Sequence, residues 1–356
     1  MEIRYLDRKE HERSRALYEE VFVEDEQAFV DAYYQIKAAD NQILVAEEDG
    51  QIVSMLHRNP YTFCFRGETV PADYLVAVAT KVSYRHRGLM RALLTKALQD
   101  MEEQELPFTF LMPADEAIYT PFDFRLMGND DEEGLAALSR EELSEDYELF
   151  TEKDAAYERR HIPWTEWEST PMMFRLVFLP EFVSRIGAQE PFTLLIQIED
   201  RILSENNGIF LWKFTEEGSR LIPSEGEPEL SVSIADLGSF LCGMLGAGEL
   251  PRLSSAGNPE AVLEKLEKIR AVYPESELRM LAVSLDRDPG PAMAYLARSP
   301  LPYPARIGDA ELIKARSGMP VPTTILYRRD GSVERELVGD VSEKRLGHYV
   351  GRIVRR

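Results

Sequence analysis

The stretch from Val78 to Arg91 constrains the fold more than any other part of the sequence, because an extended pattern changes there directly into a helical one. Residues 70–80 form an apolar run that is typical of a β-strand. A short basic loop follows, and after Gly88 the apolar residues recur at helical spacing up to about Glu103. The chain must therefore fold with a strand, a tight basic loop and an amphipathic helix in direct succession.

The elements on either side of this junction predict an α+β domain over residues 1–150. Two amphipathic helical stretches come first, and apolar runs around Asp49-Gly50 and around Gly67 then predict two β-hairpins. After the junction helix, a short buried strand and a short helix complete the order.

The rest of the chain predicts two further parts. An acidic, poorly periodic stretch over residues 130–146 indicates a boundary or a solvated linker. From Met172 a second small α+β domain is expected, and after Pro251 an α/β pattern follows, with a hairpin around Asp330-Gly331. The predicted division of the chain is 1–150, 151–255 and 256–356.

The charge of the chain limits its classes of partner. There are 41 basic and 63 acidic residues among 356, a net charge of −22. This balance argues against nucleic-acid binding, which needs clustered Lys and Arg. A negative field would concentrate cationic amines near the protein, although the charge can equally serve solubility alone.

Cysteine usage and hydropathy indicate a cytoplasmic protein. Cys64 and Cys242 lie far apart in apolar settings, which is typical of buried thiols in a reducing compartment. Two cysteines and five scattered histidines make no metal-ligand pattern. The N-terminus has no signal-peptide core, and no apolar run reaches the length of a membrane span, so neither a metal nor a membrane is expected.

The chemistry of the junction suits a pyrophosphate. The start of a helix offers unpaired N–H groups and a partial positive charge, and Gly88 lets an anion approach the backbone closely. Arg85, Arg87 and Arg91 add cationic donors. A basic loop before a helix is weak by itself, since a plain solvated helix start has the same pattern.

The order Arg85-x-x-Gly88-x-Met90 resembles the Arg/Gln-x-x-Gly-x-Gly/Ala signature of the GNAT acetyltransferase superfamily. Residues 110–124 and the run Met55-Leu56-His57 are similar to one subfamily, the Eis-like (enhanced intracellular survival) acetyltransferases. Met90 departs from the small residue that is usual in the superfamily, but a large apolar residue is common there in this subfamily.

This resemblance implies acetyl-CoA as co-substrate and a fold in which strands four and five splay apart to admit its pantetheine arm. Tyr119 matches the general acid that protonates the departing thiolate; the alternative is an ordinary packing aromatic. Asp123 replaces a glycine of the family, and Asp tolerates the left-handed backbone that the turn needs. The residues implied to hold the co-substrate are Val78, Ala79, Thr80, Arg85, His86, Arg87, Gly88, Leu89, Met90, Arg91, Ala114 and Asp115.

The general base is open. In the Eis-like family the C-terminal carboxylate is thought to take this place, but here the chain ends at Arg356 in a basic segment. Substitute candidates, which would also attract a cationic substrate, are His57 and the Glu24-Asp25-Glu26 cluster. A structural histidine and a solvated turn are the alternative interpretations.

The later parts of the chain support and modify the resemblance. Residues 171–175 and 230–237 resemble the sterol-carrier-like domain of the family, whereas only the start of its degenerate second repeat is recognisable, over residues 151–157. The tail resembles the later half of a thioredoxin-like domain, but the sequence has no Cys-x-x-Cys. Family members form ring-like oligomers, and with a shortened repeat the oligomeric state of this chain stays open.

These observations predict an N-acetyltransferase that acts on a primary amine of a cationic small molecule, of aminoglycoside or polyamine type, by direct attack. Two other classes stay open. The chain could be a non-catalytic protein that binds acetyl-CoA, because the shortened repeat leaves no amine pocket, or an interaction module whose tail engages a partner.

Overall fold

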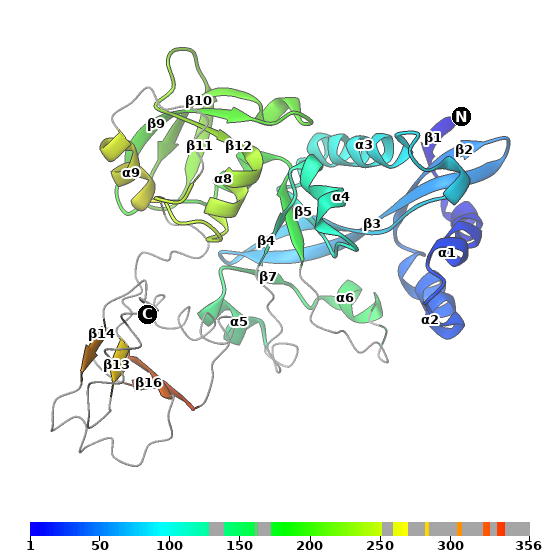
Figure 1. Cartoon of the computed structure of the whole chain (residues 1–356), viewed down its shortest axis with the longest axis horizontal. Helices are drawn as coiled ribbons and strands as arrows, with labels where there is room; N and C mark the ends of the chain where they lie inside the picture. Colours follow the sequence, from blue (N-terminus) through cyan, green and yellow to red (C-terminus); the bar gives the residue numbers. More distant parts are fainter. Residues whose placement is uncertain are drawn as a thin grey trace. The chain divides into compact units, whose positions relative to one another are not determined.

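The computed structural model describes most of the first 269 residues and four short strands beyond them (Figure 1). The chain divides into two compact units, Met1–Pro274 and Glu275–Arg356. The described residues are 1–127, 139–160, 162, 172–250, 259–269, 282–284, 305–307, 323–327 and 333–338.

The first unit is built on an eight-stranded sheet with the order β1-β2-β3-β4-β5-β8-β6, in which β7 pairs with β3. The predicted hairpins are present, because Asp49-Gly50 and Arg66-Gly67 take positive φ angles at the two tight turns. The strands are β1 (Glu2–Tyr5), β2 (Gln42–Glu48), β3 (Gln51–Phe65), β4 (Glu68–Thr80), β5 (Phe108–Leu111), β6 (Arg125–Leu126), β7 (Leu149–Thr151) and β8 (Met173–Leu176).

Helices cover both faces of this sheet, because successive apolar side chains of β2 point to opposite faces and all of them are buried. Ile43 and Val45 belong to a buried cluster with α1 and α2, whereas Leu44 and Ala46 belong to a cluster with α3. The helices are η1 (Arg8–Ser14), α1 (Arg15–Val21), α2 (Gln27–Ala32), the π-turn η2 (Tyr33–Lys37), η3 (Val82–Tyr84), α3 (Leu89–Glu103), α4 (Glu116–Tyr119), η4 (Thr120–Phe122), α5 (Arg140–Asp146) and α6 (Ala155–Arg160).

Two predictions about the middle of the chain are corrected. The strand expected to open the second domain, β8, instead lies between β5 and β6 of the large sheet. Its four residues are all buried there, so the sheet of the first domain is completed by a segment from beyond the predicted boundary. The predicted linker also contains a short helix, α5, whose Leu143 is buried.

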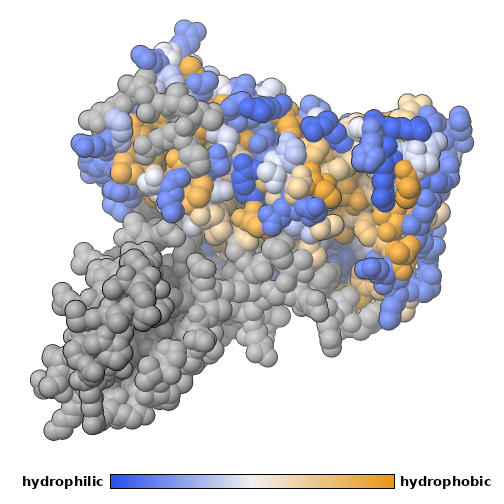
Figure 2. All heavy atoms as spheres, in the orientation of Figure 1, coloured by the Kyte–Doolittle hydropathy of each residue, from blue (hydrophilic) through white to orange (hydrophobic). Residues whose placement is uncertain are grey.

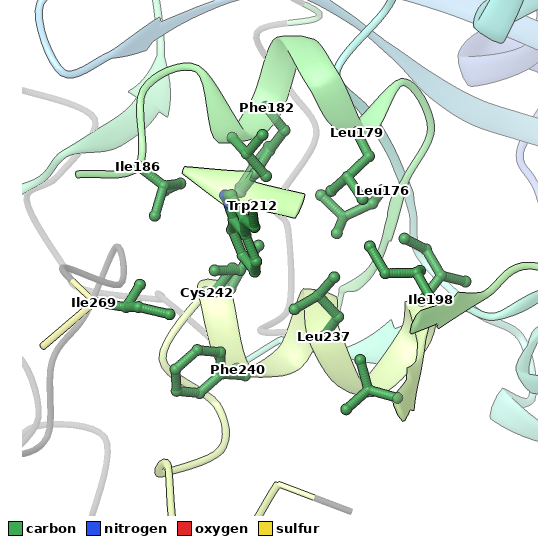
Figure 3. Close-up of a cluster of buried hydrophobic side chains, with 14 of the residues drawn as sticks. Leu176, Leu179, Phe182, Ile186, Ile198, Trp212, Leu237, Phe240, Cys242 and Ile269 are labelled. Atoms are coloured by element: carbon green, nitrogen blue, oxygen red, sulfur yellow. The ribbon is translucent and has the colours of Figure 1, made fainter. Parts of the chain in front are cut away.

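A second, four-stranded sheet follows with the order β11-β10-β9-β12, in which β12 runs parallel to β9. Trp212 of β10 lies in the middle of its core, with Phe182 and Leu237 on either side (Figure 3), and donates its indole N–H to Ser219 Oγ at 2.8 Å. The elements are α7 (Leu179–Val183), β9 (Phe192–Glu199), η6 (Ser204–Asn206), β10 (Gly208–Phe214), β11 (Ser219–Pro223), β12 (Leu230–Ser233), α8 (Ile234–Leu241) and α9 (Pro259–Glu267).

Helix α9 belongs to this second core. Val262, Leu266 and Ile269 are buried in the same cluster as Trp212, and Ile269 forms a β-bridge with Ala188. Apolar burial therefore holds the helix in the first unit, which ends at residue 274 and not at the predicted 255. The same cluster continues into Phe63, Phe65 and Phe108 of the large sheet, so the two sheets share one core.

Four strands are described in the second unit. β13 (Ala282–Ser284) pairs in parallel with β14 (Ala305–Ile307), and β15 (Thr323–Tyr327) pairs antiparallel with β16 (Val333–Val338). The hairpin predicted around Asp330-Gly331 is therefore present. Other parts of the α/β pattern predicted after Pro251 lie outside the described residues.

The surface of the molecule is mixed in character. On the face shown in Figure 2, hydrophilic residues dominate the described part of the chain, and hydrophobic residues form smaller patches between them. None of the helices among the described residues is long and apolar enough to cross a membrane.

Candidate active site

Strand β4 separates from β5 halfway along its length. The two strands pair only from Asp73–Leu75 to Thr109–Leu111, whereas β4 continues to Thr80 and stays paired with β3 on its other edge. Between the pairs Met55–Ala79 and His57–Val76, β4 carries one extra residue, and Ala77 takes a φ of 52°. Such a bulge bends a strand, so the predicted splaying is present and has a local cause.

The open edge of β4 exposes alternate peptide groups. Ser54 Oγ donates to the carbonyl oxygen of Ala79 at 2.9 Å, which shows that this peptide group faces β3. The N–H and C=O groups of Val78 and Thr80 therefore face the opposite side, where β5 has left the sheet. Thr80 already accepts a hydrogen bond there from Arg85 Nε at 3.3 Å. Of the three predicted positions, Val78 and Thr80 suit a ligand lying along the strand, and Ala79 does not.

The start of α3 lies at the end of this open edge and has no side-chain cap. The first helical hydrogen bond runs from Ala92 N to Gly88 O, so the N–H groups of Leu89, Met90 and Arg91 come before it. Gly88 and His86 both take left-handed φ angles, 78° and 61°. A Cβ at Gly88 would meet nothing within 4 Å, which leaves open space in front of the helix. Uncapped N–H groups beside open space are suited to an anion.

The predicted arginines surround this helix start in different ways. Arg85 folds back onto Thr80, and the guanidinium of Arg87 stacks on Tyr84, 4.6 Å from the ring centroid. Arg91 lies 4.9 Å from the ring centroid of Phe122 in η4 and so connects α3 to the segment that follows β5. Arg85, Arg87 and Arg91 are all solvent-exposed, as is His86, so each can move toward a bound anion.

The opposite wall of the cleft begins where β5 ends. Ala114 and Asp115 are exposed in the loop after β5, but the Asp115 carboxylate accepts a hydrogen bond from Ala117 N at 2.9 Å and caps α4. Asp115 therefore has a structural role that sequence reasoning did not assign to it. Asp123 adopts the left-handed φ of 65° that its turn requires, in line with the prediction for a position where the family has glycine.

Tyr119, the predicted acid, sits on the same wall at the end of α4. Its side chain is buried and packs edge-on against Phe124 at 6.1 Å, while its hydroxyl has no hydrogen-bond partner among the described residues. Burial raises the pKa of Tyr119 to about 12, so the phenol is protonated at neutral pH. Burial is the main cause that raises the pKa of Tyr74. The hydroxyls of Tyr61 and Tyr119 are close enough to raise it further. Tyr119 is thus near the point where β4 leaves β5.

His57 and the acidic cluster occupy different environments. His57 is fully buried beside η2, whose Tyr33 Oη lies 2.8 Å from its Nδ1, and its Nε2 has no partner among the described residues. Burial, aided by the charge of His11, lowers the pKa of His57 to about 3 and leaves it a weak base. Glu24, Asp25 and Glu26 are exposed between α1 and α2, and Asp25 accepts a hydrogen bond from Tyr18.

A cavity of about 270 Å³ adjoins the split and was not found by sequence reasoning. It lies on the face of β3 that is opposite α3, between η2 and α6, and its aromatic wall consists of Tyr61, Tyr74, Phe110 and Tyr157. Tyr74 and Phe110 form the second-last residue pair between β4 and β5, so the cavity reaches the point of separation. Its lining comes from five distant segments, which is why no single stretch of sequence signals it.

The chain resembles known proteins in two separate regions. Residues 2–127 match an acetyltransferase (GNAT) domain, and residues 179–276 match a sterol carrier protein domain. No curated protein matches the chain by sequence.

Several solved structures share its fold at low sequence identity. A probable N-acyltransferase from Enterococcus faecalis is 14% identical with a TM-score of 0.58, covering 75% of this chain and 96% of that one. A GCN5-related N-acetyltransferase from Anabaena variabilis is 15% identical with a TM-score of 0.56, covering 75% and 97%. Eis1 from Mycobacterium abscessus is 15% identical with a TM-score of 0.54, covering 76% and 97%. The resemblance of the C-terminal tail to a thioredoxin-like domain stays a prediction. The chain therefore carries a GNAT acetyltransferase domain followed by a sterol carrier protein domain.

Proposed function

We propose that this protein transfers the acetyl group of acetyl-CoA to a primary amine of a small molecule by direct attack. The observation that carries the proposal is the opening between β4 and β5, which ends at the uncapped start of α3. A GNAT domain uses acetyl-CoA as its co-substrate, and this opening joins a strand edge to an anion site, as such an elongated molecule requires.

The residues present fit that co-substrate. The open space beside Gly88 admits a pyrophosphate against the N–H groups of Leu89 to Arg91, with Arg85 and Arg87 free of carboxylate partners among the described residues. The outward peptide groups of Val78 and Thr80 would hold the pantetheine arm as an added strand would be held. Bound acetyl-CoA supplies the activated acyl group; the chain supplies orientation and proton transfer.

Tyr119 acts as the acid. Its protonated phenol, raised in pKa to about 12, gives a proton to the leaving sulfur. His57 is fully buried and has a lowered pKa, so it is not the base. The amine loses one proton to solvent before attack and a second one as the amide forms. The acceptor amine is cationic before this loss, and the net charge of −22 raises its concentration near the protein. Polyamine-like and aminoglycoside-like amines are the classes that the sequence favours.

The experiment is thiol release from acetyl-CoA with a panel of amines, on the wild-type protein and on Tyr119→Phe. The variant should lower kcat about 10²- to 10⁴-fold, the usual contribution of general acid catalysis. Its affinity for acetyl-CoA, measured by calorimetry, should be unchanged, because the hydroxyl has no protein partner among the described residues. Binding of acetyl-CoA without thiol release from any amine would favour the non-catalytic alternative. Failure of the folded wild-type protein to bind acetyl-CoA would refute the proposal.

A further inference from the structure

The cavity beside the split has a rigid aromatic wall. Tyr61 packs edge-on against Phe110 and Tyr74, with ring centroids 5.6 and 6.1 Å apart, and Tyr157 of α6 closes the row at 6.3 Å from Tyr61. Tyr74 and Phe110 contact each other at 5.3 Å. Rings packed in this way offer an apolar surface to the body of a ligand.

The charged groups of the cavity are predominantly positive. Among the described residues that line it, Lys37 at the end of η2 and Arg160 at the end of α6 are basic, and the one carboxylate is that of Asp154. Asp154 is engaged in capping α6, since it accepts hydrogen bonds from the N–H groups of Ala156 and Tyr157 at 2.8 and 2.7 Å. Its carboxylate is therefore held by the start of the helix, and it also interacts with the charge of Arg160.

The two cations interact unfavourably with each other. Burial lowers the pKa of Lys37, and the positive charge of Arg160 lowers it further. Arg160 donates to the carbonyl oxygen of Pro60, and its Nε lies 3.5 Å from Asp40. Asp40 is shared with Arg8, at 2.5 Å, so it balances Arg160 only in part. An anion placed between Lys37 and Arg160 would relieve their repulsion.

A polar residue beside the cavity also lacks a partner. Asn59 is 1% exposed, and neither its amide oxygen nor its amide nitrogen has a hydrogen-bond partner among the described residues. It lies opposite Tyr74 in the β3–β4 register, on the same face of the sheet as Tyr61. Unsatisfied buried amides are rare in folded proteins, and one next to a cavity indicates that water or a polar ligand completes the site.

We propose that this cavity is the acceptor site and that the acceptor, in contrast to the polyamine and aminoglycoside classes that the sequence favours, carries a carboxylate in addition to its amine, as an amino acid does. The carboxylate lies between Lys37 and Arg160, the body rests on the aromatic wall, and the amine reaches the split beyond Tyr74 and Phe110. This assignment rests on the proposed acetyl transfer. The cavity volume of about 270 Å³ lies just below the roughly 300–1,000 Å³ that ligand pockets commonly span, so it limits the acceptor to a small molecule.

The reaction with such an acceptor is balanced. The ammonium group first loses one proton to solvent. The neutral amine nitrogen then forms a C–N bond to the acetyl carbon and loses a second proton, while the C–S bond breaks and the sulfur takes one proton from Tyr119, which regains a proton from solvent. The products are an N-acetyl amide that keeps its carboxylate and the free thiol of CoA. No oxidant, reductant or metal is needed.

The test compares amines in matched pairs that differ only in the anionic group. Phenylalanine is paired with phenethylamine and lysine with cadaverine, and phosphoethanolamine with ethanolamine tests whether a phosphate can replace the carboxylate. The wild-type protein should show a kcat/KM roughly 10- to 100-fold higher for the carboxylate member, the size of one charge-assisted hydrogen bond. The ratio compared is the kcat/KM of the carboxylate member divided by the kcat/KM of the amine without the carboxylate. A wild-type ratio of one or less, or a preference for polyamines over amino acids, would overturn the assignment.

Charge variants locate the effect in the cavity. Lys37→Gln and Arg160→Gln should each reduce the ratio about tenfold by lowering the kcat/KM of the carboxylate member. Arg160→Lys should keep the preference, and Lys213→Gln, in the second domain, is the matched control that should change nothing. An unaltered ratio in both cavity variants would contradict the proposal even if the wild-type preference holds.

The outcome stays interpretable if catalysis itself is absent. Should the protein bind acetyl-CoA but acetylate no amine, the proposed function fails, and calorimetry of the same pairs in the presence of CoA tests the cavity alone. Carboxylate-dependent binding that disappears in Lys37→Gln supports the site, whereas equal or undetectable binding of both members refutes it. Thermal melts of each variant show whether it is folded, and the wild-type ratio decides the question if a variant is not.

Discussion

Replacing Gly88 by alanine should separate two effects that act at the start of α3. The first is backbone strain: Gly88 takes a φ of 78°, and a side chain there costs about 1–2 kcal/mol of the free energy of unfolding. No steric clash adds to this figure, because a Cβ would meet nothing within 4 Å. The second is the loss of close approach between a phosphate and the helix N–H groups. Losing one charge-assisted hydrogen bond should weaken acetyl-CoA binding roughly 10- to 100-fold.

Gly67 offers a matched control. It takes a φ of 83° in the β3–β4 turn, and a Cβ there would also meet nothing within 4 Å. Gly67→Ala should therefore lower the free energy of unfolding by a similar amount and leave acetyl-CoA binding unchanged. Urea unfolding and calorimetry measure the two quantities, and Gly88→Glu should abolish binding by adding negative charge at the anion site. Equal acetyl-CoA affinities in wild type, Gly88→Ala and Gly88→Glu would refute the assignment of the anion site.

Two further predictions concern buried ionisable groups. Asp200→Asn should lower the free energy of unfolding by about 3–5 kcal/mol in urea titrations. The reason is that Arg175 is fully buried and donates hydrogen bonds to both Asp200 carboxylate oxygens, at 2.8 and 3.0 Å. A loss below about 1 kcal/mol would contradict this prediction. His57, with its pKa lowered to about 3, should contribute stability that is complete above pH 6.5 and is lost as the pH falls toward 3. In His57→Gln the dependence of unfolding free energy on pH over this range should be shallower, and an unchanged slope would show that His57 is not the group responsible.

Much of the fold could be predicted because its signals are local. The Asp49-Gly50 turn, the apolar spacing of α3 and the left-handed Asp123 each depend on residues that are neighbours in the sequence, and the structure contains all three. The GNAT identity of the first domain came from an equally local block, Arg85-x-x-Gly88. Burial and hydrogen bonding were less predictable: nothing in the sequence shows that the Asp115 carboxylate caps α4 or that His57 is shielded from solvent.

By itself, the sequence determined the order of elements at the junction, because an apolar strand, a basic loop, a glycine and an amphipathic helix follow one another without a gap. Only the tertiary structure decided that β8 completes the first sheet and that Lys37 and Arg160 line the same cavity. The physical reason is that strand pairing and pocket lining depend on which distant segments bury apolar surface together. Which segments pack together depends on the whole core, so no short stretch of sequence shows it.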